Sequence, residues 1–169
     1  MFNKILIATH GTKGARKAEL YAIRLARAFD AELLGLYVIH KGWSSLVGIE
    51  WLHASHVRME FYRYAESQFH QRANQVLDEL RSRTEGIKIV TSVRVGEPTD
   101  VIAEEAEKNQ AEIIVVGTDS SERSEEYRAR ISIKKLIKKA PCPVLVVNGA
   151  SAIIQEGGDH ALFRLSTMS

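Results

Sequence analysis

The chain has few cysteines and no long apolar run, and each shortage excludes a class of protein. Its single cysteine, Cys142, cannot form an internal disulfide, and a Pro-Cys-Pro setting beside an apolar run favours a small buried side chain over a catalytic thiol. No stretch approaches the length of a membrane span, and the apolar run at the start is too short for a signal peptide. We therefore expect a cytoplasmic protein without a membrane partner.

A strong excess of one charge is also missing. The 23 lysines and arginines are nearly balanced by 21 aspartates and glutamates, which leaves a net charge of +2. Nucleic-acid-binding domains usually concentrate a basic excess on one face, so we expect no nucleic-acid partner. The 169 residues are 45% hydrophobic, which is sufficient for one globular domain with a core of its own.

What the chain does contain is a regular alternation of apolar strands and amphipathic helices. Strand patterns fall at residues 4–9, 33–39, 87–95, 111–116 and 144–147, and helical patterns at 15–29, 54–83, 98–106 and 131–139. Continuous apolar strands separated by helices indicate a parallel sheet covered on both faces. With right-handed crossovers, we predict one doubly wound, five-stranded α/β sheet of order 3-2-1-4-5.

This order places the ligand crevice at the carboxyl ends of the first and fourth strands. The crevice would be lined by residues 8–12, 38–40 and 95–97, and by the chain from Gly117 onward. A phosphate site there needs glycines and free helix N-terminal N–H groups. The segment after Gly117 has charged and polar residues instead of glycines. Its position in the fold is that of a nucleotide site, but its residue types do not favour phosphate binding.

The second predicted helix, over residues 54–83, is unusually long. Its apolar stripe continues into turns that we expect to project beyond the sheet. Together with the loop at residues 41–51, which carries Trp43 and Trp51, these turns could form a surface for a protein partner, or the tryptophans could anchor the loop.

Four segments in order, KILIATHGT, VRVGEPTDVI, AEIIVVGT and KKAPCPVLVV, resemble the universal stress protein family. The resemblance covers about residues 1–148 and implies the same five-stranded α/β fold. We therefore expect one domain over residues 1–148. Residues 149–169 would form a C-terminal tail, either loose or packed on a partner subunit.

Members of this family that bind ATP carry the pattern Gly-x2-Gly-x9-Gly-Ser/Thr after the fourth strand. Here the first glycine is Gly117, but the next positions are Ser120, Arg130 and Ile131. The family's aspartate at the end of the first strand corresponds to His10. These differences replace two glycines, whose backbone could approach a phosphate closely, and remove a hydroxyl and a carboxylate. The resemblance therefore implies ATP binding that is weakened or lost. The rival reading is that Arg130 turns inward and pairs with a phosphate.

The resemblance also defines the residues of the degraded nucleotide crevice, which are Ala8, Thr9, His10, Val38, Val116, Gly117, Ser120, Arg130, Ile131 and Ser132. We expect no catalytic residue, no metal and no firmly bound cofactor. The preferred function is a non-catalytic regulatory or stress-response domain that acts through an unknown protein partner. It would dimerise through the edge strand from Val144 to Val147. The alternative is an ATP-binding switch or slow ATPase.

Overall fold

The computed structural model describes residues 2–42, 55–118 and 131–149. Within these ranges five strands alternate with four helices along the chain. In order they are β1 (Lys4–Ala8), α1 (Lys13–Phe29), β2 (Glu32–His40), α3 (Ser55–Ser82), β3 (Ile89–Gly96), α4 (Pro98–Lys108), β4 (Ile113–Thr118), α5 (Ile133–Lys139) and β5 (Val144–Asn148).

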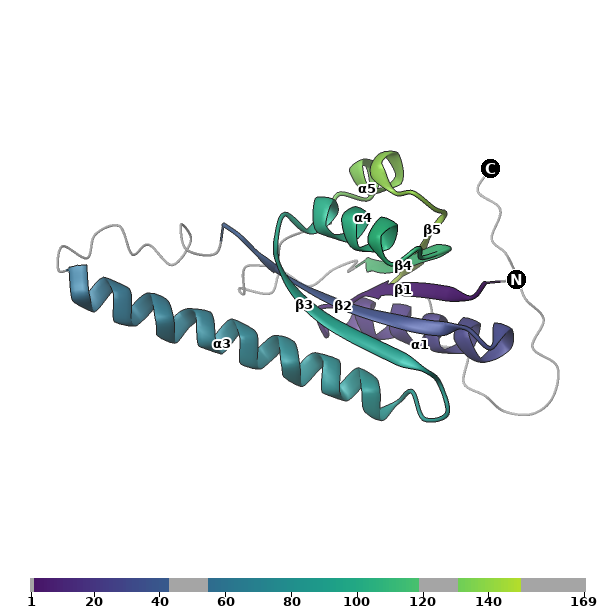
Figure 1. The fold of residues 1–169 in the computed structure, drawn as a ribbon, viewed down its shortest axis with the longest axis horizontal. Helices are drawn as coiled ribbons and strands as arrows, with labels where there is room; N and C mark the ends of the chain where they lie inside the picture. Colours follow the sequence, from purple (N-terminus) through teal and green to yellow (C-terminus); the bar gives the residue numbers. More distant parts are fainter. Residues whose placement is uncertain (1, 43–54, 119–130, 150–169) are drawn as a thin grey trace.

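The five strands form one parallel sheet in the order β3-β2-β1-β4-β5 (Figure 1). β1 lies in the centre, with Ile7 opposite both Gly35 of β2 and Val115 of β4. The predicted fold class and strand order are confirmed. The apolar runs of β1 and β4 predict this central place, because only strands covered on both faces can be apolar throughout.

The helices cover both faces of the sheet. α4 and α5 lie on one face and α1 and α3 on the other, above and below the sheet in Figure 1. Alternate strand residues therefore enter separate cores. Leu6, Val116 and Leu136 belong to the core under α4 and α5, whereas Ile7 and Val115 belong to the core under α1.

Capping residues fix where two helices begin, and both starts differ from the sequence prediction. The Thr12 hydroxyl accepts a hydrogen bond from the Ala15 N–H at 3.1 Å, so α1 begins at Lys13 and not at residue 15. Ser132 is the N-cap of α5, where its hydroxyl accepts from the Lys135 N–H, so that helix begins at Ile133. Such caps satisfy N–H groups that have no partner within the helix.

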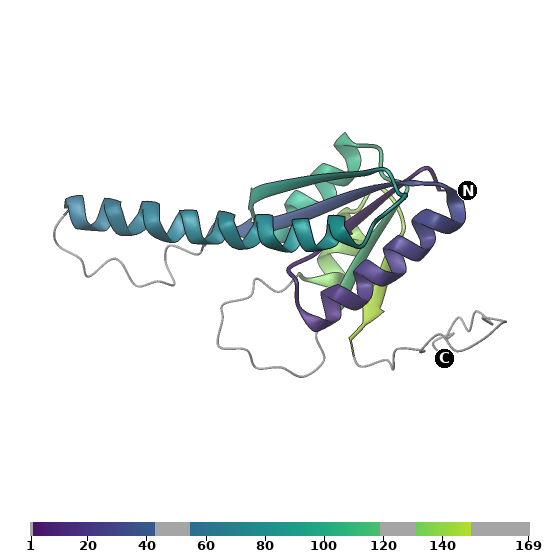
Figure 2. The ribbon, with the colours of Figure 1, turned by 90° about the horizontal axis from the view of Figure 1, so that it is seen from below.

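Helix α3 has 28 residues and extends well past the sheet at its N-terminal end (Figures 1 and 2). Its C-terminal half is buried through Ala73, Val76 and Leu80, while Met59 and Tyr64 in its N-terminal half are 54% and 62% exposed. The expected projection of this helix is therefore present. Across the described ranges, no helix combines the length and apolar character needed to cross a membrane.

Candidate functional site

The end of β1 is fixed by a buried polar network. Thr9 is fully buried, and its hydroxyl donates to Glu19 Oε1 of α1 at 2.5 Å. The other oxygen of Glu19 accepts from the Arg83 guanidinium, in the turn after α3. The same Thr9 hydroxyl accepts from the Gly11 N–H at 3.2 Å. The side chain of this predicted site residue is thus directed into the protein.

His10 follows directly, at the position where the family resemblance predicts contact with a base. Its imidazole packs edge-on against the Tyr37 ring of β2, with the ring centroids 5.0 Å apart. Tyr37 in turn packs with Ala73 and Ile39 beneath α3. The second histidine at this edge of the sheet, His40, instead lies 3.1 Å from Glu97 Oε2 and accepts from the Gly42 N–H.

Gly117 lies at the end of β4, against the first turn of α1. A Cβ atom added there would lie 2.3 Å from the Gly14 carbonyl oxygen, a distance that no side chain tolerates. Gly149 approaches the same turn, since its added Cβ would lie 3.3 Å from the Gly14 Cα. Close packing of α1 on β4 therefore requires a glycine at position 117, whether or not a phosphate binds there.

Three further predicted site residues are buried apolar side chains. Ala8, Val38 and Val116 are 4%, 3% and 0% exposed and belong to the core under α4 and α5. Ile131 packs against the same core, and Ser132 caps α5. These side chains can shape the floor of a crevice, but they offer it few polar groups. Ser120 and Arg130 lie outside the described residues.

Glu19 is the site-adjacent residue that sequence reasoning misses. A glutamate in an amphipathic helix is normally read as solvent-facing, yet Glu19 is 0% exposed. A signal was available, since Ala15, Ala22 and Ile23 lie three or four positions away on the same helical face. A charged residue within such an apolar face indicates a buried partner elsewhere in the chain.

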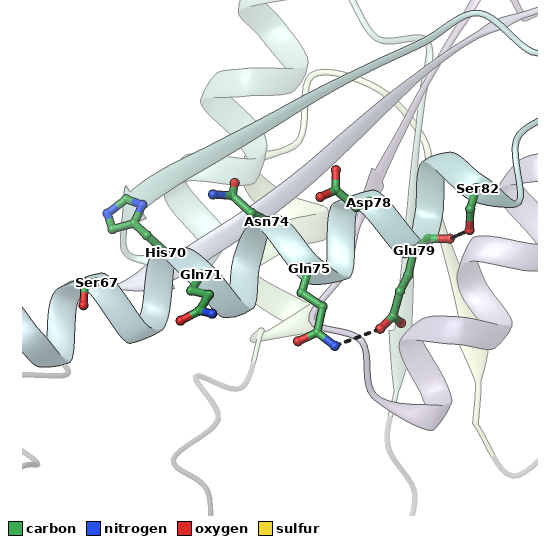
Figure 3. A pocket seen from close by; sticks show the side chains of 8 residues that line it. All are labelled: Ser67, His70, Gln71, Asn74, Gln75, Asp78, Glu79 and Ser82. Atoms are coloured by element: carbon green, nitrogen blue, oxygen red, sulfur yellow. Dashed lines mark hydrogen bonds between the residues drawn. The ribbon is translucent and has the colours of Figure 1, made fainter.

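A surface hollow lies elsewhere, along α3 (Figure 3). It measures about 890 Å³, and its described lining consists of eight polar residues from successive turns of that helix: Ser67, His70, Gln71, Asn74, Gln75, Asp78, Glu79 and Ser82. None of these belongs to the predicted crevice. The hollow is widely open and its side chains bond to one another, as Gln75 does to Glu79, so it has the character of a solvated helix face.

The residues that the structure describes include one thiol, Cys142, and no cluster of potential metal ligands. Partial burial raises the pKa of the Cys142 thiol, which keeps it protonated and weakens it as a nucleophile. Within the ranges that the structure covers, no three His, Cys, Asp or Glu side chains gather as a metal site would require. The described groups thus offer neither an activated thiol nor a metal centre.

A doubly wound parallel sheet with helices on both faces defines a Rossmann-like α/β domain. The model of the universal stress protein family matches residues 1–148, so the chain belongs to that family. Universal stress protein MJ0531 of Methanocaldococcus jannaschii is 31% identical over 147 residues, which cover 87% of this chain and 82% of that protein.

Solved structures share the fold at lower identity. The structure of hypothetical protein MJ0577 covers 88% of this chain and 96% of its own, with a TM-score of 0.68 and 24% identity. A universal stress protein family member from Arabidopsis thaliana with AMP bound covers 86% of this chain and 91% of its own, with a TM-score of 0.60 and 19% identity. At these identities the likeness concerns the fold alone.

Proposed function

We propose that this chain is a regulatory stress-response domain without catalytic turnover, in which ATP binding is weakened or lost. The observation that carries the proposal is the use of the crevice residues for packing. Ile131 replaces the family's hydroxyl with a side chain committed to the apolar core, and the Thr9 hydroxyl is bonded to Glu19. Of the crevice residues that the structure describes, these two therefore offer no polar group to a triphosphate.

Calorimetric and thermal-shift titrations with Mg-ATP test this proposal. We expect no heat of binding and no stabilisation at millimolar nucleotide, because a ligand stabilises a protein only as its concentration exceeds the dissociation constant. The matched positive control is the triple variant Ser120→Gly, Arg130→Gly, Ile131→Ser, which restores the family pattern and should gain affinity. Micromolar binding of ATP by the wild type would contradict the proposal.

A second candidate function is binding of an adenine nucleotide with fewer phosphates. Fold-sharing proteins include one with AMP bound, and a monophosphate demands fewer backbone donors than ATP does. Titration with AMP distinguishes the candidates. If AMP binds saturably and ATP does not bind, the nucleotide switch is favoured. If neither nucleotide binds, the purely regulatory domain is favoured.

Dimerisation is the second part of the proposal, through β5. This strand pairs with β4 on one side only, and Val146 on it is 37% exposed. An open apolar edge strand invites pairing with another copy, and a lysine on such an edge prevents it. In the proposed dimer, residues 149–169 would pack on the partner subunit. These residues are outside the described ranges apart from Gly149.

Light scattering after size exclusion tests the dimer. We expect Val146→Lys to convert a dimer into a monomer of unchanged fold. The control is Val90→Lys on β3, at the opposite edge of the sheet, where the side chain is 51% exposed. This variant should stay dimeric. A wild type that is strictly monomeric would refute the interface.

Partner binding has a separate surface in the projecting half of α3. The exposed apolar side chains there include Val57, Met59, Phe61 and Tyr64. Apolar and aromatic side chains are common in the centre of protein interfaces. The predicted contribution of Trp43 and Trp51 concerns residues outside the described ranges. We also propose a cytoplasmic location, in keeping with the single unpaired cysteine.

A further inference from the structure

A buried carboxylate on the inner face of α1 is not required by apolar packing. Glu19 is fully buried, and its two oxygens have different partners. Oε1 accepts from the Thr9 hydroxyl and Oε2 from the Arg83 guanidinium. A carboxylate can only accept hydrogen bonds, so both partners must direct their protons toward it. Burying the carboxylate costs desolvation energy, which the half-exposed Arg83 offsets only in part, so stability alone is a poor reason for its presence.

The carboxylate determines what the Thr9 hydroxyl can do. With its proton committed to Glu19, the hydroxyl presents its lone pairs to the Gly11 N–H at 3.2 Å. The Gly11 carbonyl accepts from Arg16 Nε at 3.3 Å. Gly11 has a φ of +72°, and a Cβ there would lie 2.7 Å from Val76 Cγ2 of α3. Both polar groups of this residue are therefore fixed where the chain turns between β1 and α1.

We propose that Glu19 is a positioning residue for the loop of residues 10–12, which follows β1 at the predicted nucleotide crevice. Paired with Arg83, it orients the Thr9 hydroxyl, which fixes Gly11 and with it the adjacent His10 against Tyr37. These contacts connect the edge of the predicted crevice to the turn after α3. An effect of Glu19 on nucleotide affinity rests on the proposed nucleotide-binding function, whereas the positioning of the loop by Glu19 does not.

A carboxylate at position 19 suits both donors. In Glu19→Gln the side-chain oxygen can accept from Arg83 if the NH2 group faces Thr9, whose hydroxyl would then accept that hydrogen bond and no longer donate to residue 19. Thr9 would keep its contact in this variant, so the variant does not test the carboxylate cleanly. A variant that removes both charged groups is more informative, because it leaves neither a buried carboxylate nor an unpaired guanidinium.

The decisive experiment is amide hydrogen exchange, measured by NMR, on the full chain carrying Glu19→Met with Arg83→Met. We expect the Gly11 amide to exchange at least about tenfold faster than in the wild type, with unchanged rates for amides of β4 and α4. Thr9→Val should reproduce the effect, and Thr9→Ser, which keeps the hydroxyl, should restore the wild-type rate. Unchanged Gly11 exchange in a folded double variant would overturn the proposal, whatever the result for Thr9→Val.

The matched control is Asp78→Asn, which breaks the exposed ion pair with Arg81 on α3, where the two side chains are 66% and 52% exposed. This pair does not touch the loop, so Gly11 exchange should not change. AMP titration adds a second readout. If the wild type binds AMP, the double variant should bind about tenfold more weakly, as expected when an ordered polar contact is lost. If the wild type does not bind AMP, the nucleotide proposal fails and the exchange rates still decide the role of Glu19.

Discussion

Both helix layers contain a buried glutamate that is bonded to an arginine, but the two glutamates hold different parts of the chain. Glu105 of α4 accepts from Arg94 of β3 at 2.7 Å, so it joins a helix to a strand. Glu19 of α1 accepts from Arg83 and also from the Thr9 hydroxyl, at the point where β1 ends. Apolar contacts are not directional, whereas hydrogen bonds fix the orientation of both partners. The Glu19 pair can therefore position the loop after β1, whereas the Glu105 pair holds α4 against the sheet.

Leu136→Ala tests the apolar core under α4 and α5, which does not depend on either glutamate, and has the largest expected effect. The side chain is fully buried, so its truncation should lower the free energy of unfolding by about 2–5 kcal/mol. The control is the neighbouring Ile137→Ala, which is 59% exposed and should change stability by less than about 0.5 kcal/mol. Urea titration followed by circular dichroism measures both. Equal losses in the two variants would show that α5 does not depend on this contact.

Gly117→Ala tests the close approach of α1 to the sheet. The new methyl group would meet backbone atoms of Gly14, so we expect a loss of about 1–3 kcal/mol in unfolding free energy. Gly35→Ala on β2 should cost less, because its nearest contacts, at 3.0 and 3.1 Å, are the side chains of Leu80 and Thr91, which can shift. Should Gly117→Ala prove as stable as the wild type, α1 would have to lie farther from β4.

Asp100→Asn tests an exposed contact between α4 and α5 and has the smallest expected effect. The Lys139 ammonium, 2.5 Å from the carboxylate, holds the pKa of Asp100 below its usual value. A lowered pKa in the folded state stabilises the protein above the ordinary aspartate range, and this contribution disappears as the pH falls through the folded pKa. The urea midpoint of the variant should therefore lie slightly below that of the wild type at neutral pH.

The same comparison at successively lower pH provides the control, since the ion pair is lost as the pH falls through the lowered pKa of Asp100 in the folded state. The two midpoints should then converge. A gap that stays constant between neutral and acidic pH would mean that the substitution acts through packing and not through charge.

The fold could be predicted from local patterns because each strand and helix shows its period in consecutive residues. The apolar run ending at Ala8 and the run from Ile113 each predict a buried parallel strand, and both lie at the centre of the sheet. The candidate site was predicted less completely. Thr9 and Gly117 lie at the expected strand ends, but their contacts are with Glu19 and Gly14, which no local pattern pairs with them.

The sequence by itself determined the α/β class, the strand order and the family. These follow from periodicity and from residue identity, which are local properties of the chain. Only the tertiary structure decided that the partner of Glu19 is Arg83, 64 residues away. The apolar neighbours of Glu19 on its helix indicate that it is buried, but the identity of its long-range partner depends on how the helices pack, and no pattern in neighbouring residues specifies that.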